Sequence, residues 1–237
     1  MNQQTWDAVD KYFGDTLLSS DSILDSALHE SNAAGLPQHN VAPNQGKLLQ
    51  IFAEMIGAKR ILEIGTLGGY STIWLARSVP SNGRVITLEA NAQYAEVAAK
   101  NIERANLTNI VDIKVGKAID TLAELVEEDS SPFDFIFIDA DKPSNPDYLQ
   151  WSLRLSRPGT VIVGDNVVRD GEVANSDSLD PKVRGVRRFC ELISEEPRLS
   201  STAIQTVGSK GYDGFAIAIV DRAETKKQKQ FSANSGR

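Results

Sequence analysis

Polar side chains that can bind ions or move protons follow two apolar runs of this chain. Asp139 and Lys142 come just after the run 133–138, and Asp165 and Asn166 end the next apolar run. In open α/β folds, ligands bind beyond the carboxyl ends of the strands, so both groups lie where chemistry is expected. Carboxylate and amide oxygens are the ligands that Mg²⁺, Ca²⁺ and Mn²⁺ prefer. The sequence therefore predicts that Asp139, Asp165 and Asn166 bind one divalent cation, with Mg²⁺ as the first candidate.

Turn formation is the alternative explanation for Asp139 or Asp165 alone, because Asp and Asn favour turns and helix caps. The set of three oxygen ligands favours a metal site over this alternative. Three protein ligands also leave positions for water and for a chelating substrate.

Strand-like and helix-like segments alternate from residue 60 onward. The expected strands are 61–64, 85–88, 111–115, 133–138 and 160–163, with a helix over 183–194. Such alternation predicts a parallel, doubly wound α/β sheet. Two further strand-like runs, 202–207 and 215–220, flank the turn-rich stretch 208–214 and predict a closing hairpin. The hairpin gives seven strands and places an antiparallel last strand in a mostly parallel sheet.

Helical periodicity of apolar side chains marks the first forty residues. Apolar residues from Trp6 to Leu17 recur at the spacing of one helix face, and Gly35 and Pro37 end a second helix. A third helix is expected after Pro43. We expect these N-terminal helices to cover the sheet.

The composition is that of a single enzyme domain. A chain of 237 residues with 41% hydrophobic content buries a substantial core, so one domain is expected over 1–221, with 1–40 as its helical cover. Residues 222–237 are polar and are expected to form a disordered tail. The net charge of −7 disfavours nucleic acid as a partner, because nucleic-acid-binding proteins usually carry a basic face. With Cys190 as the only cysteine and no secretory or membrane-spanning segment, a cytoplasmic protein is expected.

A glycine-containing loop follows the first expected strand, between Glu63 and Ser71. Gly65 and Gly69 permit a tight turn and let the backbone approach a ligand closely. The dinucleotide fingerprint is Gly-x-Gly-x-x-Gly, and Leu67 breaks it. The loop therefore favours a cofactor without a pyrophosphate over a dinucleotide.

Glu89 ends the second expected strand. A carboxylate at this position of a βαβ unit accepts hydrogen bonds from ribose hydroxyls. Capping of the following helix is the alternative function for this side chain.

Three motifs together resemble the small, metal-dependent O-methyltransferases of the catechol and caffeoyl-CoA group, which use S-adenosylmethionine. The motifs are Glu63-x-Gly65-x-x-x-Gly69-Tyr70-Ser71, Asp139-Ala140-Asp141-Lys142 and Asp165-Asn166. The likeness extends over about residues 41–220. It implies a Rossmann-like methyltransferase fold, a small phenolic or catechol-like acceptor and a homodimer.

The resemblance also implies roles for individual residues. The implied S-adenosylmethionine-binding positions are Val41, Glu63, Gly65, Thr66, Gly69, Ser71, Glu89, Ala118 and Asp139. Asp139, Asp165 and Asn166 match the metal ligands, and Lys142 and Asp139 match the catalytic positions. For Lys142, the alternative is a solvated surface lysine paired with Asp141.

Methyl transfer from a sulfonium to oxygen releases a neutral thioether, so the difficulty lies in activating the hydroxyl. A divalent cation lowers the pKa of a phenol and orients it. Two other functions remain open: methylation of hydroxylated uridine in tRNA, and a non-catalytic module that binds S-adenosylmethionine. The acidic composition disfavours the first, and the presence of all three ligand residues and the lysine disfavours the second. The helical N-terminus, the segment 167–180 and the loop 208–214 are expected to select the acceptor, whose identity stays open.

Overall fold

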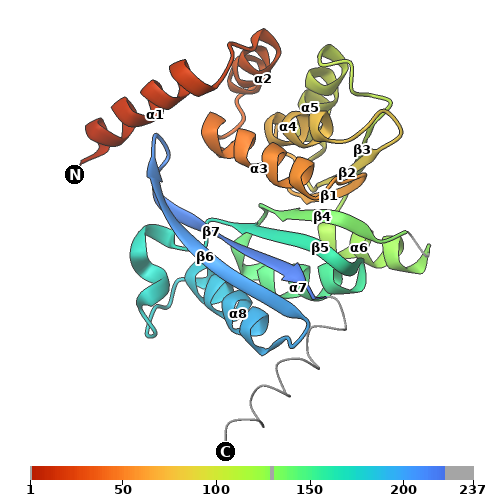
Figure 1. The fold of residues 1–237 in the computed structure, drawn as a ribbon, viewed down its shortest axis with the longest axis vertical. Coiled ribbons are helices and arrows are strands. Elements are labelled where there is room, and N and C mark those ends of the chain that lie inside the picture. Colours follow the sequence, from red (N-terminus) through yellow and green to blue (C-terminus); the bar gives the residue numbers. More distant parts are fainter. Residues whose placement is uncertain (1, 129–130, 222–237) are drawn as a thin grey trace, which may run out of the picture.

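A seven-stranded sheet forms the centre of the molecule, in the order β3-β2-β1-β4-β5-β7-β6 (Figure 1). The computed structural model describes residues 2–128 and 131–221, so the tail expected at 222–237 lies outside the described residues. The strands are β1 (Arg60–Ile64), β2 (Arg84–Glu89), β3 (Val111–Val115), β4 (Phe133–Ile138), β5 (Ser156–Asp165), β6 (Leu199–Gly208) and β7 (Gly211–Val220). Neighbouring strands from β3 to β5 pair in parallel, and β7 pairs antiparallel with β5 and β6. The predicted fold class is confirmed.

Helices lie on both faces of this sheet (Figure 1). The α-helices are α1 (Gln3–Leu17), α2 (Ser22–Ala33), α3 (Pro43–Met55), α4 (Tyr70–Ser78), α5 (Ala92–Arg104), α6 (Ala118–Glu127), α7 (Asn145–Arg154) and α8 (Pro181–Glu195), with short 3₁₀ segments η1 (Lys142–Ser144) and η2 (Arg169–Ala174). Residues of α3, α4 and α5 share one apolar core, and those of α6, α7 and α8 share the other. The strand order reverses between β1 and β4, which is where such folds bind ligands. Within the described ranges, no helix is long and apolar enough to cross a membrane.

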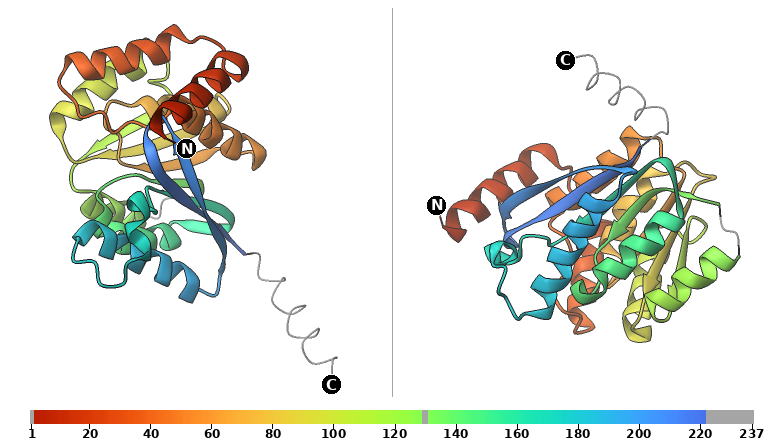
Figure 2. Two further views of the ribbon diagram at one scale, coloured as in Figure 1. Left: turned by 90° about the vertical axis from the view of Figure 1, so that its left-hand side faces the viewer. Right: turned by 90° about the horizontal axis from the view of Figure 1, so that it is seen from below.

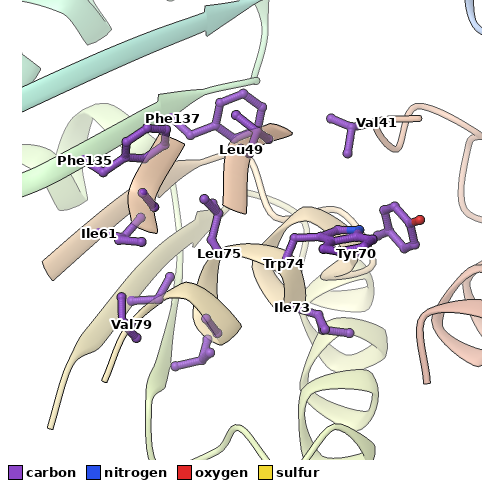
Figure 3. Close-up of a cluster of buried hydrophobic side chains, with 14 of the residues drawn as sticks. Val41, Leu49, Ile61, Tyr70, Ile73, Trp74, Leu75, Val79, Phe135 and Phe137 are labelled. Atoms are coloured by element: carbon purple, nitrogen blue, oxygen red, sulfur yellow. The ribbon is translucent and has the colours of Figure 1, made fainter. Parts of the chain in front are cut away.

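Apart from Asp134 near its start, strand β4 is apolar, because helices cover both of its faces. Phe133, Phe135 and Phe137 are fully buried. Figure 3 shows Phe135 and Phe137 beside Leu49 of α3, in the cluster that also holds Trp74 of α4. These aromatic side chains therefore belong to the core and not to a ligand site.

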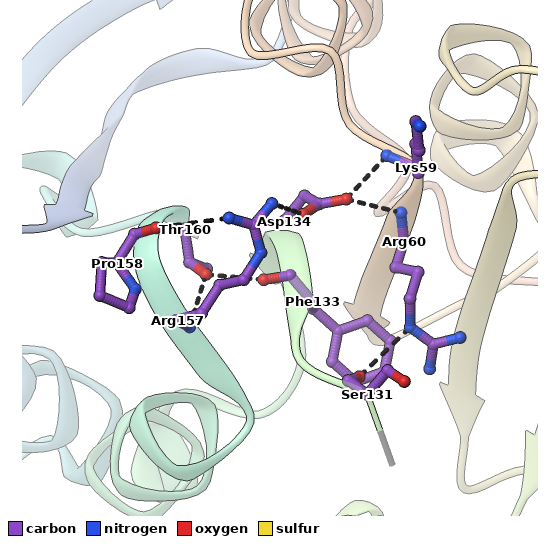
Figure 4. Close-up of polar contacts among 8 residues, drawn as sticks. All are labelled: Lys59, Arg60, Ser131, Phe133, Asp134, Arg157, Pro158 and Thr160. Atoms are coloured by element: carbon purple, nitrogen blue, oxygen red, sulfur yellow. Dashed lines mark hydrogen bonds and ion pairs between the residues drawn. The ribbon is translucent and has the colours of Figure 1, made fainter. Parts of the chain in front are cut away.

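A polar network fixes the amino ends of β1, β4 and β5 (Figure 4). Asp134 accepts hydrogen bonds from the amides of Lys59 (2.8 Å) and Arg60 (3.0 Å), and it pairs with the guanidinium of Arg157. Burial opposes the charge of Asp134, yet these two amides and Arg157 hold its pKa below the ordinary value. This network sets the register of the central strands at the end of the sheet opposite the expected site.

The N-terminal helices do not all cover the sheet. Helix α3 packs on α4, and α2 packs on α5 and α4. Helix α1, in contrast, contains no buried residue and lies beside the β6–β7 hairpin (Figures 1 and 2). Gln3 donates to the carbonyl of Gly208 (2.9 Å), and Asp10 accepts from the amide of Ser209 (2.7 Å). The expectation of a covering helix is wrong for α1, because its apolar periodicity specifies a helix and not the partner of its apolar face.

The closing hairpin is longer than the sequence pattern indicates. Gly208 pairs with Gly211, so only Ser209 and Lys210 form the turn. The expected loop at 208–214 is therefore mostly strand. Main-chain pairing extends through these glycine and polar residues although their side chains carry no strand pattern.

Candidate active site

The loops that follow β1 and β4 touch at the carboxyl edge of the sheet. A Cβ atom on Gly65 would lie 2.3 Å from the carbonyl oxygen of Asp139, and Gly65 has a φ of +106°. Both facts require glycine at this position. The amide of Asp139 also donates to the carbonyl of Ile64 at 2.9 Å. The glycine loop and the first acidic motif thus form one surface.

Glu63 is fully buried beneath this loop. Its carboxylate accepts hydrogen bonds from the hydroxyls of Ser71 (2.6 Å) and Thr87 (2.7 Å) and from that of Thr72. Burial raises the pKa of Glu63 to about 7, although the three hydroxyls oppose that rise. Its two oxygens are occupied by protein donors, so Glu63 acts on the loop through the side chains that it binds.

Other residues of the loop are also held by the protein. The Thr66 hydroxyl lies 2.6 Å from that of Thr87, and Gly69 caps α4 with a left-handed φ of 81°. Both residues are buried. Their backbone, not their side chains, is what they offer to a ligand.

Glu89 at the end of β2 has protein partners on both oxygens. It accepts from the amides of Leu67 (2.8 Å) and Asn91 (2.9 Å). Asn91, and not Glu89, caps α5 with its own side chain. The side chain thus ties the glycine loop to β2, and each of its oxygens keeps a lone pair with which it could accept a further hydrogen bond.

Val41 and Ala118 flank this edge from two other elements. Val41, labelled in Figure 3, is buried two residues before α3 begins, and Ala118 is the half-buried first residue of α6. Since α6 follows β3, the expected cofactor residues lie at or just after the carboxyl ends of β1, β2, β3 and β4, with Val41 from the N-terminal layer.

Lys142 is a buried side chain with 7% exposure. Its Nζ donates to Asp139 Oδ1 at 3.0 Å. Asp141 instead accepts from Ser144 Oγ (2.6 Å) and from the Tyr148 hydroxyl (2.5 Å). The alternative of a solvated lysine paired with Asp141 is therefore wrong.

Asp165 ends β5 with 4% exposure, next to Asn166, whose φ is +54°. Burial and the charge of Asp139 raise the pKa of Asp165 to about 7, while Lys142, the Asn166 amide and a hydrogen bond from Gln45 act in the opposite direction. Asp139 and Asp165 are thus close enough to repel each other. Sequence reasoning missed Gln45, because nothing in its type or spacing marks it as a partner of β5.

The donor set fits a hard divalent cation. Two repelling carboxylates and one amide, from Asp139, Asp165 and Asn166, supply oxygen alone, the chemistry that Mg²⁺ and Ca²⁺ require. In the described part of the chain, no group of three or more His, Cys, Asp or Glu side chains is arranged to hold a metal. A positive charge bound here would offset the repulsion between the two carboxylates.

A cavity of about 530 Å³ lies elsewhere, and it is lined by Met55, Asp134, Arg157 and Ile219 among others. Met55 is the last residue of α3, and the other three lie near the amino ends of β4 and β5 and near the end of β7. That is the edge opposite the residues described above, so the cavity does not belong to the candidate site.

Comparison with known proteins identifies the family. A model of the O-methyltransferase family matches residues 18–217. The catechol O-methyltransferase of Niastella koreensis is 54% identical over 93% of this chain and 100% of its own length, and that of Mycobacterium tuberculosis is 50% identical over 90% and 94%.

Two solved structures agree with this result. An O-methyltransferase from Bacillus cereus in complex with SAH has a TM-score of 0.92 and 59% identity, covering 93% of this chain and 100% of that one. TomG from Streptomyces achromogenes in complex with SAM has a TM-score of 0.91 and 46% identity, covering 94% and 100%. The chain therefore belongs to the O-methyltransferase family, as an S-adenosylmethionine-dependent enzyme of the catechol and caffeoyl-CoA type.

Proposed function

We propose that this enzyme transfers a methyl group to a hydroxyl of a small catechol-like acceptor with the help of a divalent cation. The observation that carries the proposal is the grouping of the half-buried carboxylate of Asp139 with the buried Asp165, which it repels, and with the buried Lys142. This group lies against the glycine loop through Gly65. The names of two relatives, both catechol O-methyltransferases, support the same acceptor class.

The cofactor pocket is assigned to the edge around the glycine loop. Gly65, Thr66 and Gly69 would bind the methionine portion through their backbone, Glu89 would accept from the ribose diol, and Ala118 would line the adenine side. Glu63 and Ser71 hold the loop in shape through their hydrogen bond. Val41 closes the pocket from the N-terminal layer. When bound, S-adenosylmethionine supplies a methyl group on a positively charged sulfur.

The cation site is assigned to Asp139, Asp165 and Asn166. When bound, a divalent cation lowers the pKa of adjacent hydroxyls and orients them. Lys142 would take or stabilise the proton of the reacting hydroxyl at Nζ, and Asp139 would orient that amine. Because burial and Asp139 raise the pKa of Asp165 to about 7, protons compete with the cation below neutral pH.

Chelation tests the proposal. With catechol and S-adenosylmethionine, activity should disappear in a chelator and return with Mg²⁺. Asp165→Ala should abolish Mg²⁺-stimulated turnover, whereas Asp147→Ala, at an exposed position of α7, should not. Full activity of Asp165→Ala in chelator would contradict the proposal, as would a failure of the wild type to methylate any vicinal diol.

The tRNA alternative gains no support from the net charge of −7. The ligand residues and Lys142 are all present, which disfavours a non-catalytic module. We propose the cytoplasm as the compartment, because a chain with one cysteine gains nothing from an oxidising environment.

The enzyme is also proposed to form a homodimer. An isolated helix of this length is marginal in water unless its apolar side packs on something, and α1 buries no residue within one subunit. Its exposed apolar side chains are Val9, Tyr12, Phe13 and Leu17. A second copy of the chain is the partner that would cover them.

A further inference from the structure

Arg169 lies three residues beyond the proposed cation ligand Asn166, in the loop after β5. The two residues have φ angles of +55° and +54°, a region that non-glycine side chains rarely adopt. Such strain clusters at functional sites. Three peptide units span at most about 11 Å, so Asn166 lies within the distance that an arginine side chain at position 169 could bridge together with a small ligand.

Strand β7 holds this strained loop in place. Asp213 Oδ1 accepts the amides of Val168 (2.9 Å) and Arg169 (3.1 Å), and the amide of Val167 donates to the carbonyl of Gly214 (3.0 Å). The backbone at Arg169 and at the two residues before it is therefore fixed by hydrogen bonds to Asp213 and Gly214 of β7. A surface arginine needs no such support.

The guanidinium of Arg169 is poorly matched by the protein. Its one described ionic contact joins Nη1 to Asp213 Oδ2 at 3.5 Å. Its Nε is shielded from solvent and has no hydrogen-bond partner among the described residues. Arg198, in contrast, directs Nε (2.9 Å) and Nη2 (3.0 Å) onto the two oxygens of Glu196.

The difference in pairing between Arg169 and Arg198 favours a ligand-binding role for Arg169 over a structural one. Arginine binds a carboxylate best with two parallel hydrogen bonds, and an unsatisfied shielded donor is unfavourable. Arg169 uses one nitrogen weakly on Asp213 and leaves its Nε side without an acceptor. A planar anion from outside the chain would supply the acceptor that the Arg169 guanidinium lacks.

We propose that Arg169 binds a carboxylate on the methyl acceptor, so that the preferred substrates are catechols that carry a carboxylate on the ring or on a short side chain. This inference rests on the proposed function, because it takes the acceptor to be held at Asp139, Asp165 and Asn166. A guanidinium fork matches a carboxylate in shape and charge, and it discriminates against a neutral amide.

The test compares two acceptors that differ in charge. Initial rates with 3,4-dihydroxybenzoate and 3,4-dihydroxybenzamide give the ratio of their kcat/KM values at saturating S-adenosylmethionine and Mg²⁺. The wild type should prefer the benzoate about tenfold or more. Arg169→Gln should remove most of that preference through a higher KM, and Arg169→Lys should restore part of it, because lysine keeps the charge without the fork.

Binding provides a second readout that does not depend on turnover. Calorimetry of 3,4-dihydroxybenzoate with the SAH-loaded enzyme and Mg²⁺ should show a Kd about tenfold higher for Arg169→Gln. Arg184→Gln, which removes the same charge from an exposed position of α8, should match the wild type in the preference ratio and in Kd.

Each result decides the proposal. Equal rates for the two acceptors in the wild type, or an unchanged preference in both Arg169 variants, would overturn the inference and leave the proposed function standing. If Arg169→Gln does not fold, the ratio and Kd of Arg169→Lys decide. If no vicinal diol is methylated in the presence of Mg²⁺, the proposed function fails and this inference fails with it.

Discussion

A buried lysine needs a partner, and Lys142 has one in Asp139. The chain spacing of three residues predicts that these side chains can meet, but it equally allows the neighbouring Asp141 as the partner. The choice depends on tertiary structure. Tyr148 of α7 and Ser144 of η1 bind Asp141 and leave Lys142 to face Asp139.

Replacement of Lys142 by Ala should lower kcat by about 10² to 10⁴, the range for loss of a general base. Affinity for S-adenosylmethionine should change little, because other residues form the cofactor pocket. The pH–rate profile should show partial recovery at high pH, where hydroxide takes over deprotonation. Lys100→Ala, at an exposed position of α5, is the control. A variant that binds the cofactor poorly but reacts normally once loaded would make Lys142 a structural residue.

Glu63 links stability to pH. Burial raises its folded-state pKa to about 7 from 4.5, so the folded protein binds the proton more tightly than the unfolded chain. The stability contributed by the protonated form is full below pH 4.5, falls as the pH rises to about 7 and is lost above that. The change is about 3 kcal/mol.

Glu63→Gln removes this titration. The decrease in unfolding free energy that Glu63 causes between pH 4.5 and 7 should therefore be absent from the variant. Urea unfolding at a series of pH values measures it, as the difference in unfolding free energy between wild type and variant. Glu96→Gln, at an exposed position of α5, should leave the pH dependence unaltered. Parallel stability curves for wild type and Glu63→Gln would show that Glu63 is ionised throughout.

Among the elements, the parallel strands were the easiest to predict. A strand that is covered on both faces is almost entirely apolar, and this pattern can be recognised in the sequence without knowing which strands pair with it. The structure extends β5 back to Ser156 and β7 back to Gly211, through residues such as Arg157, Pro158 and Asp213 whose side chains carry no strand pattern. Main-chain pairing sets these ends. For the same reason, the contact between Gln45 and Asp165 could not be foreseen, since it joins α3 to β5 across the fold.

Gly65→Ala tests the contact between the β1 and β4 loops. The added Cβ would meet the Asp139 carbonyl at 2.3 Å, so one loop must shift and cofactor binding should weaken by tenfold or more, on the order of 1.4 kcal/mol. Gly159→Ala is a matched control, because Gly159 also has a positive φ (+94°) but nothing within 4 Å of the added atom. Calorimetry with SAH should therefore show a loss for Gly65→Ala alone. An equal loss in both variants would assign the effect to backbone strain.

At the scale of the whole molecule, helix α1 leaves its apolar side uncovered. Three hydrogen-bonding residues, Gln3, Asp10 and Asn44, connect this helix to the hairpin turn and to α3. Its apolar side chains remain exposed, with Leu17 at 71%. The adjoining edge strand β6 is also exposed along most of its length. A folded edge strand beside an uncovered amphipathic helix is a surface that a second subunit would bury.

Phe13→Glu should therefore convert the proposed dimer to a monomer of 25.8 kDa, because it places a charge among the exposed apolar side chains of α1. Sedimentation equilibrium at several protein concentrations measures the mass. Lys11→Gln lowers the net charge by the same amount on the same helix, at a residue whose side chain faces solvent and pairs with Asp15, and it should leave the dimer intact. A wild type that sediments as a monomer at about the protein concentration used for assays would refute the dimer. If Phe13→Glu and Lys11→Gln both remained dimers, the second subunit would have to bind a different face of the molecule, and the exposed apolar side of α1 would need another partner.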